Sequence, residues 1–122
     1  MIYKVIFFVV TAFVTLLNAQ TTIAVSIAPQ KALADAIGGD KVNVIAMIPS
    51  GASPHSYEPK PSQMLSISKA KAYFTIGIEF EEAWMGRFHS QNKNMIIFDS
   101  TKGIKKIKMA AHRHDKAEHE DY

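Results

Sequence analysis

The chain contains no cysteine, and this absence excludes several kinds of site. Its 122 residues can form no disulfide, thiolate metal site or iron–sulfur cluster, and they offer no cysteine nucleophile. The sequence also lacks the G-x-S-x-G elbow, the Walker loop, the G-x-G-x-x-G fingerprint and the H-E-x-x-H motif. Any bound metal must therefore be held by imidazole and carboxylate groups. Nothing in the sequence supports an enzyme.

The net charge of the chain is also small. The formal net charge is +3, and one of the 14 bases, Lys4, lies in the first 19 residues, so 13 bases face 11 acids in the remainder. A net charge of +2 is too weak to indicate nucleic-acid binding. Aromatic residues are not interleaved with the bases, so no surface for stacking nucleic-acid bases is expected.

Residues 1–19 are predicted to be a cleavable secretory signal peptide. Lys4 supplies the charged start, Val5 to Leu17 form an apolar run, and Ala19 ends a small-residue cleavage site. The run is too short to cross a hydrocarbon core of about 30 Å comfortably. A buried core helix and a retained membrane anchor are the alternatives. No cysteine follows the run, so a lipid anchor is not expected, and export to the periplasm is predicted.

Residues 20–108 are predicted to form one α/β lobe with a mostly parallel, four-stranded sheet flanked by helices. Short runs rich in β-branched residues alternate with segments of helical periodicity, as in parallel α/β proteins. Gly38 and Gly39 end the first helix, and a loop rich in Pro, Ser and Gly spans residues 49–60. The predicted strands are 21–28, 42–48, 72–77 and 95–99, and the predicted helices are 29–37, 61–70 and 80–89.

His55 is the best-supported candidate metal ligand in the sequence, because of its place in a proline-rich loop after a predicted strand. It follows the second predicted strand, and ligands of open α/β sheets bind beyond the carboxyl ends of the strands. Pro54, Pro59 and Pro61 stiffen its loop, and neutral imidazole is a good ligand for zinc. Glu79 is expected at the same edge, where it could orient the imidazole. The alternatives are a surface histidine, and acids (Glu79, Glu81 and Glu82) that serve only the helix dipole.

Residues 109–122 form a tract rich in His, Asp and Glu, with almost no apolar side chains. It cannot bury a core, so it is predicted to be a flexible loop. Histidine-rich tracts often bind metals, which makes His112, His114 and His119 further candidate ligands. A solvated hinge without metal is the open alternative.

The order of these pieces resembles the metal-binding solute-binding proteins of zinc and manganese ABC transporters, in particular the periplasmic zinc-binding ones. The resemblance lies in AVSIAPQKALADAIGGD, VNVIAMIPSGASPHSYEPKPSQM, AKAYFTIGIEFEEAW and the acidic histidine-rich tract. It implies two α/β lobes joined by a long helix, with the metal between them. His55 matches the first histidine ligand, and His112, His114 and His119 fall in the histidine-rich loop.

The resemblance also implies the partners. They are a divalent metal ion, zinc rather than manganese, and an inner-membrane ABC permease that receives it; the receptor is expected to be monomeric. The family's further ligands and its second lobe have no counterpart in this sequence, so the chain is expected to be the front part of such a protein. The alternatives are a stand-alone periplasmic metal buffer that uses the tail, and a degenerate fragment.

Overall fold

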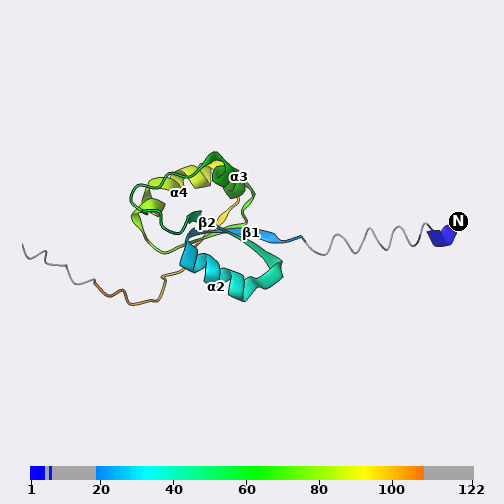
Figure 1. The fold of residues 1–122 in the computed structure, drawn as a ribbon, viewed down its shortest axis with the longest axis horizontal. Helices are drawn as coiled ribbons and strands as arrows, with labels where there is room; N and C mark the ends of the chain where they lie inside the picture. Colours follow the sequence, from blue (N-terminus) through cyan, green and yellow to red (C-terminus); the bar gives the residue numbers. More distant parts are fainter. Residues whose placement is uncertain (5, 7–18, 109–122) are drawn as a thin grey trace, which may run out of the picture.

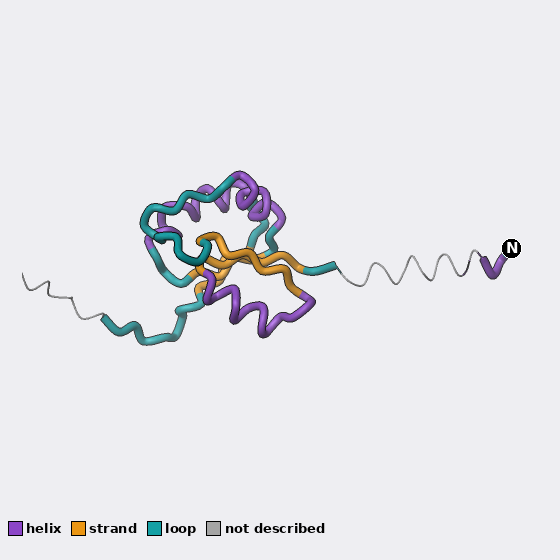
Figure 2. Tube along the Cα trace, viewed as in Figure 1, coloured by secondary structure: helices purple, strands orange, loops and turns teal. Residues whose placement is uncertain are grey.

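The computed structural model describes residues 1–4, 6 and 19–108 of the chain. The predicted apolar run of the signal peptide, apart from Ile6, and the tract at 109–122 lie outside these residues. In the described part, no helix is both long and apolar enough to cross a membrane. Figure 1 and Figure 2 show a sheet with helices on both faces. The elements are β1 (Thr21–Ile27), α2 (Ala28–Gly38), a 3-10 turn (Gly39–Lys41), β2 (Val42–Ile48), α3 (Pro61–Lys69), β3 (Ala72–Thr75), α4 (Glu79–Gln91) and β4 (Ile96–Asp99).

The four strands are all parallel and lie in the order β2-β1-β3-β4. β1 therefore lies inside the sheet, and helices cover both of its faces (Figure 1). This explains its nearly continuous apolar sequence: Ala24, Val25 and Ser26 are all buried. The prediction of a parallel, four-stranded α/β sheet is confirmed. The order of the strands could not be read from the sequence.

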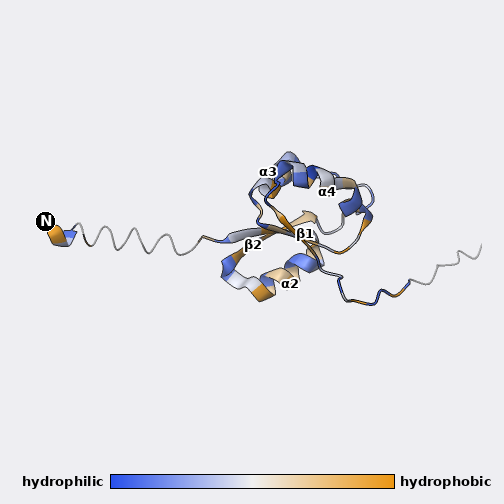
Figure 3. Ribbon diagram, turned by 180° about the vertical axis from the view of Figure 1, so that it is seen from behind, coloured by the Kyte–Doolittle hydropathy of each residue, from blue (hydrophilic) through white to orange (hydrophobic). Residues whose placement is uncertain are grey.

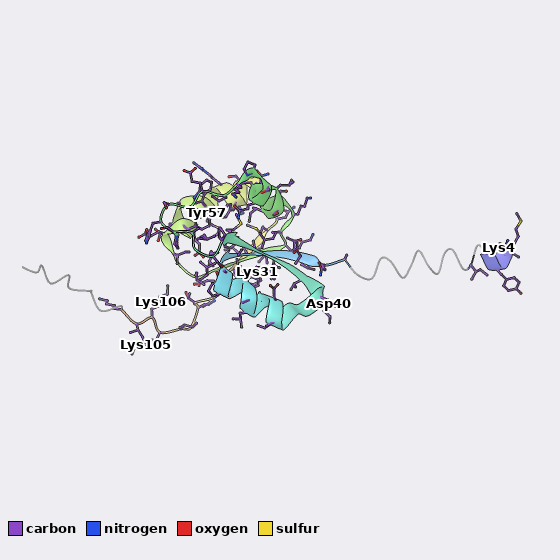
Figure 4. All side chains as sticks on the ribbon, in the orientation of Figure 1. Lys4, Lys31, Asp40, Tyr57, Lys105 and Lys106 are labelled. Atoms are coloured by element: carbon purple, nitrogen blue, oxygen red, sulfur yellow. The ribbon has the colours of Figure 1, made fainter. Side chains whose placement is uncertain are left out.

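The strand order determines which helix covers which face. The chain moves one way from β1 to β2 and the opposite way from β2 to β3 and from β3 to β4. Because crossovers between parallel strands are right-handed, α2 lies on one face and α3 and α4 lie on the other. Figure 1 shows this arrangement, and in Figure 4 Lys31 lies on the α2 side and Tyr57 on the α3–α4 side.

The hydrophobic core lies between the sheet and the α3–α4 pair. Tyr73 of β3 stacks on Phe88 of α4 with ring centroids 5.6 Å apart, and Phe80 packs against Phe88 at 6.0 Å. Trp84 is half-buried and stacks on these two phenylalanines along its own helix. The other core residues are Ala24, Met47, Ile48, Ile67, Ala70 and Met95.

The first predicted helix forms, but its apolar side chains are less covered than helical periodicity suggests. Leu33 is 65% exposed and Ile37 is 80% exposed, and α2 contains no buried residue. Ala83 of α4 is exposed as well. Figure 3 shows hydrophobic positions along the ribbon of α2. The periodicity identified the helix correctly, but it could not tell how much of the apolar side the neighbouring elements cover.

Candidate functional site at the carboxyl edge of the sheet

The candidate site lies where the crossover direction reverses, between β1 and β3. After β1 the chain turns to one face of the sheet, and after β3 it turns to the other, so the two strand ends diverge. Such a reversal is where open α/β sheets bind their ligands. Glu79 begins α4 directly after β3, and the loop that carries His55 follows β2 on the far side of β1.

The structure brings His55 and Glu79 into contact. Nδ1 of His55 lies 2.6 Å from Oε2 of Glu79, although 24 residues separate them in the sequence. Both side chains are open to solvent, at 74% and 73% exposure. With its Nδ1–H donated to the carboxylate, the neutral imidazole keeps its Nε2 lone pair for a ligand, which is the arrangement found around metal-bound histidines.

The loop around His55 is held by turns and by one aromatic anchor. The backbone N–H groups of Ser56 and Tyr57 both donate to the carbonyl of Ser53, which closes a turn around His55. The Tyr57 hydroxyl donates to Gln63 at 2.8 Å, and its ring packs 6.3 Å from that of Phe80. The imidazole therefore lies two residues from a partly buried side chain that packs against the core.

Each helix that begins at this edge is started by an amide or carboxyl side chain at its third position. Oε1 of Gln30 accepts the N–H groups of Ser26 and Ile27, while its Nε2 donates to the carbonyl of Phe74. Gln63 accepts the N–H of Lys60 in the same way. The signal for this role was present in the sequence, because Gln or Glu three residues after the N-cap is a capping pattern.

Glu81 plays the same part in α4, and here the sequence interpretation was incomplete. Glu81 was grouped with Glu79 and Glu82 as a first-turn acid, but it is only 5% exposed. Its carboxylate accepts the backbone N–H groups of Ile76, Gly77 and Ile78 and the hydroxyl of Ser26. Position in the helix alone did not show that Glu81, unlike Glu79 and Glu82, points beneath the turn between β3 and α4.

A tyrosine completes this buried network. The hydroxyls of Tyr73 and Ser26 lie 2.9 Å apart, and both residues are fully buried. Burial raises the pKa of the Tyr73 phenol well above its ordinary value, the hydrogen bond to Ser26 lowers it in part, and the nearby charge of Glu81 raises it further. The phenol therefore acts as a neutral donor, and the hydrogen bonds run from Tyr73 to Ser26 to Glu81.

Two further features border the edge. A shallow pocket of about 370 Å³ lies beside the His55 loop, lined by the start of α2 and by residues 48–52 and Pro54. At the end of β4, the hydroxyl and the N–H of Thr101 donate to the carboxylate of Asp99, and these two hydrogen bonds lower the pKa of the Asp99 side chain. Neither feature adds a ligand to His55.

Within the residues that the structure describes, no three His, Cys, Asp or Glu side chains gather closely enough to hold a metal ion. His55 and Glu79 meet, whereas His89 is exposed in the last turn of α4. The predicted ligands His112, His114 and His119 lie outside the described residues. A complete zinc site needs about four ligands, so His55 supplies at most one part of such a site.

These features define the class of structure: an α/β lobe with an imidazole–carboxylate pair at the carboxyl edge of its sheet, where the crossover direction reverses. Residues 23–122 match the family model described as the periplasmic zinc-uptake complex component A, ZnuA. The chain belongs to this family. The prediction that it is related to solute-binding proteins and not to enzymes is thereby confirmed.

Individual relatives agree with the family match. A crystal structure of a zinc-bound ZnuA deletion mutant superposes with a TM-score of 0.69 at 42% identity, covering 75% of this chain and 35% of that one. A putative metal-binding protein of Treponema pallidum is 29% identical over 85 residues, which are 69% of this chain and 27% of that protein. The manganese ABC transporter substrate-binding lipoprotein scaA of Streptococcus gordonii is 43% identical over 51 residues, 39% of this chain and 16% of its own length. The matches thus span about a third or less of the relatives' length.

Proposed function

We propose that this chain provides the metal-capturing amino-terminal lobe of an extracytoplasmic ABC uptake receptor, with zinc as the preferred ion. The observation that carries the proposal is the contact between His55 and Glu79 at the carboxyl edge of the sheet. A carboxylate that holds Nδ1–H fixes the tautomer and the direction of the imidazole, and it raises the basicity of the ring toward a metal at Nε2. Family membership supports the same role.

Capture would combine His55 with ligands from elsewhere. His112, His114 and His119 are one proposed source, since imidazole is the ligand type that zinc takes from histidine-rich tracts. The other proposed source is a second lobe, since most of the length of the longer relatives lies outside the part that matches this chain. Release to an inner-membrane permease would follow when the two sources separate, because a single imidazole holds zinc weakly.

The location and the cargo belong to the same proposal. Residues 1–19 would direct export as a signal peptide, and the family description places its members in the periplasm. Zinc is preferred over manganese because the candidate ligands are imidazoles, which suit zinc, whereas manganese favours carboxylate, carbonyl and water oxygens. Binding should weaken in acid, because protons compete for the imidazole lone pair.

Calorimetric titration with zinc tests the role of His55. We compare the wild type with His55→Ala and with a matched control, His89→Ala, which removes an exposed histidine from the far end of α4. Loss of His55 should weaken zinc binding at least tenfold, while loss of His89 should leave it unchanged. Equal affinity in the wild type and His55→Ala would contradict the proposal.

The same titration separates the receptor from the metal buffer. A triple variant that replaces His112, His114 and His119 by Ala keeps the lobe intact. If zinc binding disappears in this variant but is untouched by His55→Ala, the chain acts as a buffer through its tail. Dependence on both sets of residues supports one shared site. Repeating the titration with manganese tests the preference for zinc.

A further inference from the structure

Two glutamates in the first turn of α4 lie in opposite environments. Glu79 is 73% exposed and contacts His55, whereas Glu81, two residues later, is 5% exposed and has its hydrogen-bond partners beneath the turn. A buried carboxylate is costly unless donors surround it, so its position requires an explanation. Four donors do surround it: three backbone N–H groups and the Ser26 hydroxyl.

These donors belong to the segment that sets the position of Glu79. Ile76, Gly77 and Ile78 form the connection from β3 to α4, and Glu79 is the next residue. Gly77 has a φ of +76°, a conformation in which glycine is readily accommodated, so its own backbone does little to restrain the turn. The carboxylate of Glu81 collects all three N–H groups, the shortest of them from Gly77 at 2.7 Å.

The same carboxylate ties this connection to the middle of the sheet. Ser26, which donates to Glu81, lies near the end of the central strand β1, and Tyr73 of β3 holds Ser26 in turn. The network therefore joins β1, β3 and α4 at the point where the crossover direction reverses, directly below the start of α4. A shift of the connection would move Glu79 relative to β1 and β2, and the loop that carries His55 follows β2.

We propose that Glu81 is a positioning residue for the pair formed by His55 and Glu79. Its buried hydrogen bonds fix the turn before α4. The exposed Glu79 carboxylate is thereby held in the position from which it accepts Nδ1–H of His55. Preorganisation of this kind reduces the ordering cost that an exposed pair would otherwise incur when a metal binds. The consequence for metal affinity rests on the proposed function above, whereas the effect on the imidazole does not.

The first test is made on the metal-free protein, by nitrogen-15 NMR of the His55 ring at a pH where imidazoles are neutral. In the wild type we expect the Nδ1–H tautomer, held by Glu79. Glu81→Gln should shift His55 toward the Nε2–H tautomer. Glu82→Gln is the matched control, because it removes the same charge from an exposed position of the same turn, and it should leave the ring unchanged.

The second test is a double-mutant cycle on zinc affinity. Glu81→Gln should weaken binding about three- to tenfold, less than the 10- to 100-fold typical for a direct partner of a ligand. In a Glu79→Gln background the same change should have no further effect, since Glu81 acts through Glu79. Independent, multiplying effects of the two changes would overturn the proposal.

A purely structural role for Glu81 predicts a different result. Glu81→Gln would then lower the thermal midpoint and leave both the His55 tautomer and the zinc affinity of the folded protein at wild-type values, which overturns the proposal.

If Glu81→Gln does not fold, Ser26→Ala decides, because it cuts the link to β1 and leaves the backbone hydrogen bonds of Glu81 in place. It should move the His55 tautomer in the same direction by a smaller amount, and an unchanged ring would again overturn the proposal. If zinc binding proves independent of His55 while the tautomer shifts, the proposed function fails and the positioning role stands.

Discussion

The two faces of this sheet are built from similar residues but are covered unequally. On the α3–α4 face, Tyr73, Phe80 and Phe88 are fully or almost fully buried and stack on one another. On the α2 face, Phe74 and Phe98 also stack, with ring centroids 5.2 Å apart, yet Phe98 is 47% exposed. The type of residue is the same on both faces, so the difference comes from the number of helices that the topology assigns to each face.

The difference has a consequence for the site. α2 packs over β1 and β2 and leaves an apolar pocket of about 450 Å³ between itself and the sheet, lined by residues that include Ile23, Leu33 and Phe74. The well-packed face instead carries α4, whose first residue is Glu79. The candidate site is therefore attached to the face that has the larger buried core, which favours a fixed geometry.

The largest contrast is expected between two phenylalanines on opposite faces. Phe88→Ala removes a fully buried ring and should lower the free energy of unfolding by about 3–5 kcal/mol. Phe98→Ala removes a half-exposed ring of equal size and should cost about 1 kcal/mol. Urea unfolding followed by circular dichroism measures both. Equal losses would show that the α2 face contributes as much to stability as the α3–α4 face.

A second prediction concerns Tyr73, which is fully buried on the α3–α4 face. The pKa of Tyr73 is raised in the folded protein, so Tyr73 does not make the free energy of unfolding depend on pH below the ordinary pKa of 10.0. Above that pH the unfolded chain loses the proton while the folded chain keeps it, so the free energy of unfolding falls by up to about 1.4 kcal/mol per pH unit. Tyr73→Phe should reduce this dependence between pH 10 and 11.5, as measured by urea unfolding at each pH. An identical slope in both proteins would contradict the assignment of Tyr73 as a neutral buried donor.

The smallest effect is expected on the exposed side of α2. Ile37→Ser replaces a side chain that is 80% exposed and should change the free energy of unfolding by no more than about 0.5 kcal/mol. Ile67→Ser is the matched control on the other face, where the same change buries a hydroxyl in the core and should cost several times more. A large loss from Ile37→Ser in urea unfolding would show that α2 is better covered in solution than the structure indicates.

Much of the site could be anticipated from the sequence, and the limit is instructive. His55 and Glu79 were both expected at the carboxyl edge, because each follows a strand, and the structure places them 2.6 Å apart. Their role as ligand and orienting group remains a prediction. Ser26 and Tyr73 were not identified, since a serine and a tyrosine in apolar strands carry no distinctive pattern. Glu81 was named only as a first-turn acid, and its capping position did not show that it is buried against Ser26. Their meeting depends on β1 and β3 being neighbours.

By itself the sequence determined the alternation of strands and helices, because apolar periodicity, Pro and Gly positions and capping residues act over a few residues along the chain. It also determined the ligand chemistry, since a chain without cysteine leaves imidazole and carboxylate. Tertiary structure alone decided the strand order, and with it the unequal coverage of the faces and the network under α4. The physical reason is that these features depend on contacts between segments 40 to 55 residues apart, such as Ser26 with Tyr73 and Glu81, which no local pattern encodes.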